Sequence, residues 1–310
     1  MVEDRLLISA IVCTHNRAAL LNDALASLAN QTMDKEKYEV IIVDNASTDN
    51  TREVVARWVE QQPNFRYIYE PNLGLSHARN RGAAEAKAPI VAYIDDDARA
   101  CEDWLSQLVQ RFEAIPDLAA VGGPISLVWE GGNAPVWMNR HLMHALGYLN
   151  YGDIAQSVAH LNGGNMAIAR RYLGEYGGFK PSLGRHGISL LGGEESDLMF
   201  WLRRRGEKIY YEPRAKVQHW VPLERQRARY LLRVYYGIGF SDALRSDDGN
   251  RLYRLRRAVM DLPVRSYKAI RHSHPINLAG IIMILACETA LVLGLAKGQY
   301  SQSNRRANAN

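Results

Sequence analysis

Short apolar runs alternate with amphipathic segments along the first hundred residues of the chain. Four runs have the length and continuous hydrophobicity of buried strands: residues 6–14, 38–48, 65–70 and 88–97. The segments between them have helical spacing, with Leu21, Leu25 and Leu28 on one face of the first, and further helices expected over residues 51–61 and 76–86. Continuous apolar strands that alternate with helices predict an α/β fold, with a mostly parallel sheet flanked by helices on both faces.

The hydrophobic pattern is less regular in the second half of the chain. Residues 122–165 are rich in Gly, Asn, Trp and Tyr, which predicts a loop-rich region. A helix is expected from Glu195 to Arg205, followed by a strand, a turn and a strand over residues 208–219. A basic and aromatic helical segment is expected over residues 223–244.

Polar side chains follow three of the predicted strands at the point where each one ends. Ligands of parallel sheets bind beyond the carboxyl ends of the strands, so these residues are candidates for a binding site. They are Thr14, His15, Asn16 and Arg17 after the first strand, Asp44, Asn45 and Ser47 after the second, and Asp95, Asp96 and Asp97 after the fourth.

The three consecutive carboxylates suggest a metal site. Like charges at this spacing repel each other, and a bound Mg²⁺ or Mn²⁺ would relieve the repulsion and complete its shell with phosphate oxygens and water. Asp95 and Asp97 could reach the same ion, and His219, at the end of a later strand, could add a nitrogen ligand. The alternatives are a solvated acidic turn and a structural histidine.

Further candidates lie on predicted turns and helix starts. Asp44 could accept a hydrogen bond from a base or a ribose hydroxyl, while Ser47 or Asp49 caps the next helix. Arg79 would lie one turn into a helix whose N-terminus favours phosphate, although a surface arginine is the simpler alternative. Three acidic residues, Glu194, Glu195 and Asp197, lie at the start of the helix near residue 195. The helix dipole alone would favour acidic residues there, and the alternative is that one of them acts as a general base.

In this order, the motifs resemble those of the family 2 glycosyltransferases, which have the type A glycosyltransferase fold. The resemblance covers roughly residues 6–240 and rests on seven segments: CTHNR (13–17), VDNASTD (43–49), GLSHARNRG (74–82), DDD (95–97), GGNMAIARR (163–171), GEESDL (193–198) and VQH (217–219). No one segment is specific, but seven in the family's order and spacing are. The QRARY segment at 226–230 is similar to a motif of processive synthases, but the chain lacks the several membrane helices of those enzymes.

The resemblance implies a metal-dependent, inverting transfer of a sugar. It places the following residues in the nucleotide-sugar site: Thr14, Asn16, Arg17, Asp44, Asn45, Ser47, Arg79, Asp95 and Asp96. Asp95 and Asp97 would hold Mn²⁺ or Mg²⁺, with His219 as a possible third ligand. Glu195 would be the catalytic base, with Glu194 as its rival and Asp197 as the third acid of the motif. The donor would be a nucleotide-diphospho-sugar, with UDP favoured by Asp44, and the acceptor a glycan or lipid-linked hydroxyl in polysaccharide or cell-envelope glycan synthesis.

Two other classes of protein compete with this interpretation. A nucleotidyltransferase or another nucleotide-sugar-binding enzyme would share the sheet and the carboxylates. It should, however, have a glycine-rich phosphate loop with lysine after the first strand, and CTHNRAALL contains no glycine. A non-catalytic basic binding protein would explain the C-terminal charge but not the acidic strand ends.

Composition and charge narrow the possible partners. Hydrophobic residues make up 47% of the chain, which excludes a disordered protein. The formal charge of +5 is uneven, because residues 1–202 contain 17 basic and 25 acidic side chains whereas residues 203–310 contain 21 and 8. An acidic body with a basic C-terminal third argues against nucleic acid and favours a membrane surface or an anionic ligand near that third.

The apolar run at 276–296 is long enough to cross a bilayer, since 21 residues of helix span about 31 Å. Glu288 inside it would cost about 2.5–3.5 kcal/mol on insertion. Three interpretations remain: a helix lying on the membrane beside the basic segment 223–271, a single span, and a helix packed on the catalytic domain. The first two place the enzyme at the cytoplasmic face of the cell membrane, and three cysteines without metal-binding spacing fit that reducing compartment.

The expected organisation follows from these features. Residues 1–222 would form the catalytic domain, with nucleotide binding in 1–100 and acceptor binding in 101–222. Residues 223–298 would form a helical C-terminal extension that contacts the membrane, and residues 299–310 a disordered tail. The oligomeric state is left open.

Overall fold

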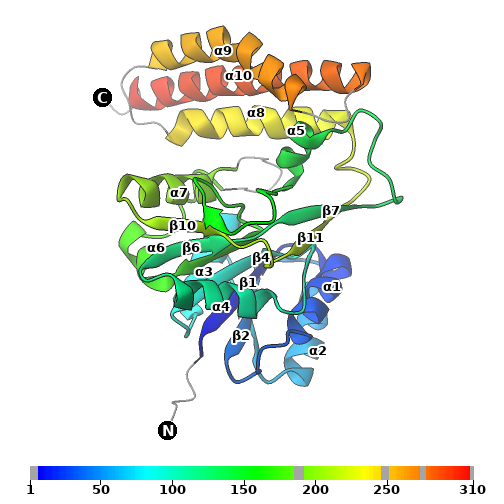
Figure 1. The fold of residues 1–310 in the computed structure, drawn as a ribbon, viewed down its shortest axis with the longest axis vertical. Helices are drawn as coiled ribbons and strands as arrows, with labels where there is room; N and C mark the ends of the chain where they lie inside the picture. The colour runs from blue at the N-terminus through cyan, green and yellow to red at the C-terminus, as the bar shows by residue number, and fades with distance from the viewer. Residues whose placement is uncertain (1–5, 185–191, 246–250, 273–276, 308–310) are drawn as a thin grey trace. The chain divides into compact units, whose positions relative to one another are not determined.

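A computed structural model describes residues 6–184, 192–245, 251–272 and 277–307 (Figure 1). The chain divides into two compact units. The first contains Met1–Ser126, Leu149–Pro181 and Glu194–Trp220, and the second contains Leu127–Tyr148, Ser182–Gly193 and Val221–Asn310. The second unit takes in residues 127–148 and 182–193, which the sequence assigned to the catalytic domain, together with the C-terminal region.

The first unit is built on an eight-stranded sheet of order β3-β2-β1-β4-β9-β6-β10-β8. Its strands are β1 (Ile8–Thr14), β2 (Tyr38–Asp44), β3 (Phe65–Tyr69), β4 (Ile90–Asp95), β6 (Leu118–Gly122), β8 (Gln156–Ser157), β9 (Asn165–Ala169) and β10 (Lys208–Tyr211). Strands β3, β2, β1 and β4 are mutually parallel, as are β6 and β10, whereas β9 and β8 run antiparallel to their neighbours. The predicted mostly parallel sheet is therefore confirmed.

Helices cover both faces of this sheet because successive strand residues point to opposite sides. In β1, Ala10 and Val12 belong to a core formed with α1 (Ala18–Ala29), α2 (Thr51–Gln61) and α4 (Trp104–Ala114). Ile11 belongs to a second core formed with α3 (Leu75–Glu85), α6 (Arg170–Tyr176) and α7 (Glu194–Arg204). The helices expected over 51–61, 76–86 and 195–205 lie within one residue of the observed ones.

A second, three-stranded sheet has the order β5-β11-β7. It consists of β5 (Ala98–Ala100), β11 (Val217–Val221) and β7 (Ile125–Trp129). Strand β5 begins three residues after the end of β4 and pairs antiparallel with β11, so that Ala98 lies opposite His219. This pairing brings a histidine from late in the sequence to the acidic end of β4.

The second unit is helical. It contains α5 (Arg140–Met143), a 3₁₀ turn at His144–Leu146, α8 (Ala228–Arg245), α9 (Arg251–Arg271) and α10 (Leu278–Ala307). Helix α10 packs against both α8 and α9 (Figure 1). Its apolar core includes Leu142, Leu231, Tyr235, Ile284 and Cys287.

Helix α10 extends further than the sequence suggested. Residues 299–307 were expected to be disordered, but they continue the helix. Gly298 approaches the backbone of Phe240 in α8 and Gln299 is buried, so the helix still packs on α8 just beyond its apolar run. Residues 308–310 lie outside the described part. Among the described residues, one segment, Leu278–Ser301 of α10, is long and apolar enough to cross a membrane by length and composition alone.

Candidate active site

The polar strand ends that the sequence singled out lie side by side at one edge of the large sheet. Parallel register places Thr14 of β1 opposite Asp44 of β2, and Cys13 of β1 opposite Asp95 of β4. Because β1 lies between β2 and β4, the three polar turns share the carboxyl edge of the sheet.

Asp95, Asp97 and His219 form a cluster that fits a metal ion. Each offers one ligand atom, and these atoms all lie within 4.8 Å of one another. His219 Nε2 lies 3.0 Å from Asp97 Oδ1. Two carboxylates and one imidazole suit a divalent cation such as Mn²⁺, so the side chains present fit the ion that the sequence implied.

Arg17 completes the charge pattern around the carboxylates. Its Nη1 forms an ion pair with Asp97 Oδ2 and lies 3.7 Å from Asp96 Oδ1. Burial raises the pKa of Asp96 to about 7, with Asp97 adding to the rise and Arg17 opposing it. Burial also favours the neutral form of Asp97, but His219 and Arg17 outweigh it and hold the pKa of Asp97 below its usual range. The adjacent carboxyls therefore differ sharply in how readily they ionise.

Asn16 and Ser47 hold the first two polar turns together. Asn16 adopts a left-handed backbone conformation, with φ of 52°, which asparagine tolerates better than most residues. Its side-chain Oδ1 accepts hydrogen bonds from the backbone N–H groups of Thr48 (2.7 Å) and Asp49 (3.3 Å), and its own N–H donates to Ser47 Oγ (3.0 Å). These two predicted nucleotide-site residues thus shape the edge of the site.

Asp44 is buried and faces Tyr67, which the sequence analysis did not identify. Asp44 Oδ1 accepts from the Ser47 N–H at 3.0 Å, and Oδ2 accepts from the Tyr67 hydroxyl at 2.9 Å. Burial and the Asp44 carboxylate raise the pKa of Tyr67 to about 12, so its hydroxyl remains a donor at neutral pH. Tyr67 lies on the neighbouring strand β3, and only strand pairing, which sequence does not specify, would have revealed it.

Asn45 links the second polar turn to the start of α3. Its Nδ2 donates to the carbonyl oxygens of Glu70 (3.2 Å) and Asn72 (2.7 Å), and its Oδ1 accepts from the Gly74 N–H (2.7 Å). Asn45 is 4% exposed. Its side chain therefore fixes the loop that leads into the helix carrying Arg79.

Arg79 and Glu194 form a buried ion pair. Arg79 Nη1 lies 2.7 Å from Glu194 Oε1, and the two residues are 4% and 2% exposed. The guanidinium also lies over the rings of Tyr93 (5.8 Å) and Phe179 (5.5 Å). Glu194 is therefore engaged with Arg79, and Arg79 is a fixed positive charge beneath the site surface.

Glu195 and Asp197 differ in their surroundings. Asp197 accepts from the Tyr176 hydroxyl and lies 2.8 Å from Lys180 Nζ, so its carboxylate is used within the fold. Glu195 is half-buried, and among the residues that the structure describes none forms a hydrogen bond or ion pair with its carboxylate. Of the three acids at the start of α7, Glu195 is the one available to a substrate.

The Gly163–Asn165 turn positions backbone against the acidic cluster. A Cβ on Gly164 would lie 2.6 Å from Asp95 Oδ2, so any larger residue there would force the Asp95 carboxylate to move. Asn165 is fully buried, with Oδ1 accepting from Trp104 Nε1 (2.9 Å) and Nδ2 donating to the Ala215 carbonyl (2.8 Å). Asn165 could not be singled out from the sequence, where its only signal is its place in the GGN segment.

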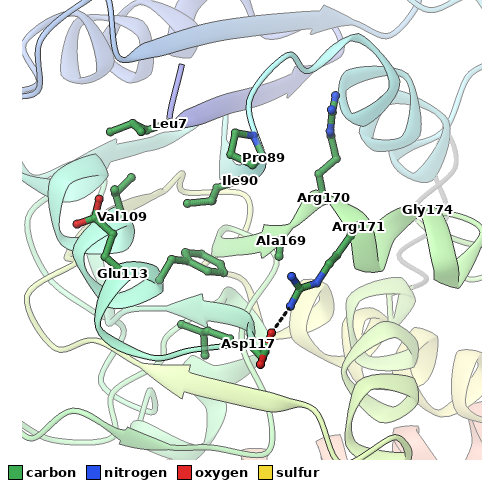
Figure 2. A pocket seen from close by; sticks show the side chains of 12 residues that line it. Leu7, Pro89, Ile90, Val109, Glu113, Asp117, Ala169, Arg170, Arg171 and Gly174 are labelled. Atoms are coloured by element: carbon green, nitrogen blue, oxygen red, sulfur yellow. Dashed lines mark hydrogen bonds and ion pairs between the residues drawn. The ribbon is translucent and has the colours of Figure 1, made fainter. Parts of the chain in front are cut away.

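A separate pocket of about 740 Å³ lies at the opposite edge of the sheet (Figure 2). It is lined by Leu7, Ile90 and Leu118, which stand at the amino ends of their strands. Its arginines are used by the fold, because Arg171 forms an ion pair with Asp117 (3.2 Å) and Arg170 donates to the Ala86 carbonyl. This pocket is distant from the acidic strand ends and contributes no group to them.

A mostly parallel sheet whose carboxyl edge gathers acidic, imidazole and arginine side chains places this protein among the α/β proteins that bind ligands at that edge. The family model described as Glycosyl transferase family 2 matches residues 9–177, more than half of the chain. The protein therefore belongs to glycosyl transferase family 2 and is a glycosyltransferase. This confirms the resemblance seen in the motifs and sets aside the nucleotidyltransferase and the non-catalytic binding protein.

Known proteins similar to this chain fit the assignment. This chain is 27% identical over 217 residues to a glucosyl-dolichyl phosphate glucuronosyltransferase of Haloferax volcanii. The matched residues make up 68% of each chain. The chain is 27% identical over 246 residues to the succinoglycan biosynthesis protein ExoM of Rhizobium meliloti, which covers 77% of this chain and 75% of ExoM. A mannosyltransferase from Pyrobaculum calidifontis, solved with GDP-mannose and Mn²⁺, has a TM-score of 0.64 at 21% identity, covering 96% of this chain and 88% of that one. The expected type A glycosyltransferase fold is thereby confirmed.

Proposed function

We propose that the enzyme transfers a sugar, with inversion, from a nucleoside-diphosphate sugar to a hydroxyl of a glycan or a lipid-linked acceptor. The observation that carries the proposal is the cluster of Asp95, Asp97 and His219 at the carboxyl edge of the sheet, with ligand atoms within 4.8 Å of one another. A solved structure of similar fold contains GDP-mannose and Mn²⁺, which supports a nucleotide-sugar donor and a divalent cation here.

The side chains divide the work. Asp95 and Asp97, with His219, would hold Mn²⁺ or Mg²⁺, and the bound ion would neutralise charge on the leaving diphosphate. Arg17 forms an ion pair with Asp97 and so holds its carboxylate in place. Arg79 is a buried positive charge that interacts electrostatically with Asp95. Asp44, braced by Tyr67, would receive the base or ribose of the nucleotide, and uracil is the base we favour.

Glu195 is the proposed general base. Its carboxylate would take the proton from the acceptor hydroxyl while the oxygen attacks the anomeric carbon from the face opposite the nucleotide. Glu194 cannot take this role without releasing Arg79, because the two form a pair at 2.7 Å with almost no exposure to solvent. Removal of the base should slow transfer by about 10²–10⁴-fold.

The acceptor and the location are the finer parts of the proposal. The names of two relatives point to a dolichyl phosphate glycolipid and to succinoglycan, which supports an acceptor from lipid-linked or polysaccharide synthesis. Such acceptors and the basic C-terminal third of the chain favour an enzyme that acts at the cytoplasmic face of the cell membrane. We propose no role for nucleic acid.

The test is a donor panel assayed with and without Mn²⁺. UDP, GDP and dTDP sugars are screened for slow hydrolysis, and then for transfer to lipid-linked and glycan acceptors. With the active pair, Asp97→Ala and Glu195→Gln should both lose transfer. The matched controls Asp117→Ala and Glu175→Gln should retain it, since both side chains are exposed and pair with exposed arginines, Arg171 and Arg205. Wild-type transfer by Asp97→Ala or Glu195→Gln would refute the assignment.

A further inference from the structure

Helix α10 leaves one apolar face uncovered. Leu278, Ile282, Leu285, Leu293 and Tyr300 are between 46% and 73% exposed. They recur at steps that keep them on one side of a helix, with Thr289 and Lys297 completing the row. Over these residues the face is about 33 Å long, at 1.5 Å per residue.

The other side of α10 is held tightly against α8. A Cβ on Gly294 would overlap the Tyr236 carbonyl oxygen, and one on Gly239 would overlap the Leu291 carbonyl oxygen. The two helix backbones therefore touch through glycines, an arrangement that allows no side chain between them. Because this contact fixes the rotation of α10, the apolar row stays exposed within this unit.

Glu288 ties α10 to two further elements. Its carboxylate lies 2.6 Å from Arg265 Nη2 in α9 and 3.1 Å from His141 Nε2 in α5, and it is 3% exposed. A helix surrounded by lipid on all sides would lose both partners. The acidic residue that makes a span costly is thus the residue that keeps α10 packed in the unit.

Helix α9 carries an apolar row of its own beside positive charges. Val259, Met260, Val264 and Tyr267 are between 52% and 67% exposed. Exposed basic residues accompany them on the same helix: Arg256, Arg257, Lys268 and Arg271. Exposed apolar side chains next to arginine and lysine are typical of helices that lie in the plane of an anionic membrane.

We propose that the exposed sides of α9 and α10 bind in the plane of an anionic lipid bilayer, without spanning it. We call this region the docking surface. It consists of exposed apolar and basic residues of the two helices: Val259, Met260, Val264, Tyr267, Lys268 and Arg271 of α9, and Leu278, Ile282, Leu285, Leu293 and Tyr300 of α10. Its apolar side chains enter the boundary between headgroups and acyl chains, while Lys268 and Arg271 meet lipid phosphates. A second copy of the chain fits less well, because it would bring the same positive charge to the contact. The inference builds on the proposed membrane location.

The test is flotation of the full-length enzyme with vesicles of phosphatidylcholine alone or mixed with phosphatidylglycerol. The wild type should float with the anionic vesicles, bind less at high salt and be released by alkaline carbonate. Lys268→Gln/Arg271→Gln should weaken binding by about 25-fold, at about fivefold per basic residue. Ile282→Gln/Leu285→Gln/Leu293→Gln should abolish flotation. The controls Ile154→Gln and Arg203→Gln/Arg204→Gln change an exposed apolar residue and exposed charges elsewhere and should float normally.

Four results would overturn the docking surface: no preference for anionic vesicles, normal flotation of either docking variant, resistance to carbonate, or a wild-type dimer that dissociates in the apolar variant. Resistance to carbonate would indicate a span. Donor hydrolysis is measured on the same preparations without vesicles, and the docking variants should retain it. Loss of hydrolysis in the wild type would contradict the proposed function and leave the flotation result standing.

Discussion

The buried pair of Arg79 and Glu194 separates two adjacent glutamates that sequence alone leaves as rivals. In Glu194→Gln the side chain keeps its shape and an oxygen that can accept from the guanidinium, but Arg79 loses the carboxylate that pairs with it and keeps only the more distant charges of Glu195 and Asp95. Arg79 is 4% exposed, so water cannot replace the lost charge. In Glu195→Gln, by contrast, the neutralised carboxylate is half-buried and acts on Arg79 without an ion pair or hydrogen bond, so less stability should depend on it.

The expected magnitude follows from burial. Removing one partner of a buried ion pair costs about 3–5 kcal/mol. Because glutamine retains one hydrogen bond, we expect a loss near the lower end, about 3 kcal/mol. A catalytic unit of this size loses about 2–4 °C of melting temperature for each kcal/mol, so Glu194→Gln should melt about 6–12 °C below the wild type. Glu195→Gln should melt within about 2 °C of it.

The assay pairs thermal unfolding with initial rates of transfer at a temperature where all variants are folded. Glu194→Gln should keep measurable transfer, whereas Glu195→Gln should lose it at wild-type stability. The control is Arg79→Met/Glu194→Leu, in which both charges are replaced by apolar groups, and it should regain part of the stability lost in Glu194→Gln. If Glu194→Gln melted like the wild type and lost all transfer, Glu194 would be the base and the reasoning from burial would be wrong.

Two further predictions test other parts of the structure. Gly164→Ala should impair Mn²⁺ binding and transfer, because its Cβ would lie 2.6 Å from Asp95 Oδ2 and displace that carboxylate. In the control Gly174→Ala the added Cβ meets no atom within 4 Å, so this variant should behave as the wild type. Equal metal affinity in both variants would contradict the steric argument. For Glu288, burial favours the neutral acid, but His141 and Arg265 outweigh it and lower the pKa below 4.5. The ionised pair should therefore stabilise the wild type above pH 4.5 and lose this effect as the pH falls. Urea unfolding at pH 7 and pH 4 should show a smaller acid-induced loss in Glu288→Gln, and an unchanged loss would exclude the ion pair as its cause.

The strands and their polar ends could be predicted from sequence because both depend on local pattern. A continuous apolar run such as that of β2 signals a strand buried on both faces, and parallel topology brings the ends of such strands to one edge. The hydrophobic pattern is therefore enough to predict that Asp44, Asp95 and Asp97 lie at the same edge of the sheet. His219 can also be identified, because the VQH segment follows a strand pattern, although its pairing opposite Ala98 is visible only in the fold.

Contacts between distant segments could not be predicted in the same way. Arg79 and Glu194 are 115 residues apart, and nothing local distinguishes a glutamate that pairs with a buried arginine from one that faces a substrate. Asn165 is similar, since its partners Trp104 and Ala215 lie on other elements. In both cases the deciding fact is which polar group each buried side chain can reach, because burial without a partner is costly.

The energetic role of Glu288 that the sequence suggests differs from the one that the fold shows. In the sequence it is an acid within an apolar run, and its only energetic effect is a penalty for crossing the bilayer. In the fold it pairs with Arg265 and His141 from two other elements. The length and hydropathy of α10 are compatible with a span, but the ion pair and the glycine contacts with α8 bind the helix to protein on its inner side. What remains available to lipid is its outer row of side chains, so contact along the membrane plane needs no disruption of the unit, whereas a span would break both sets of contacts.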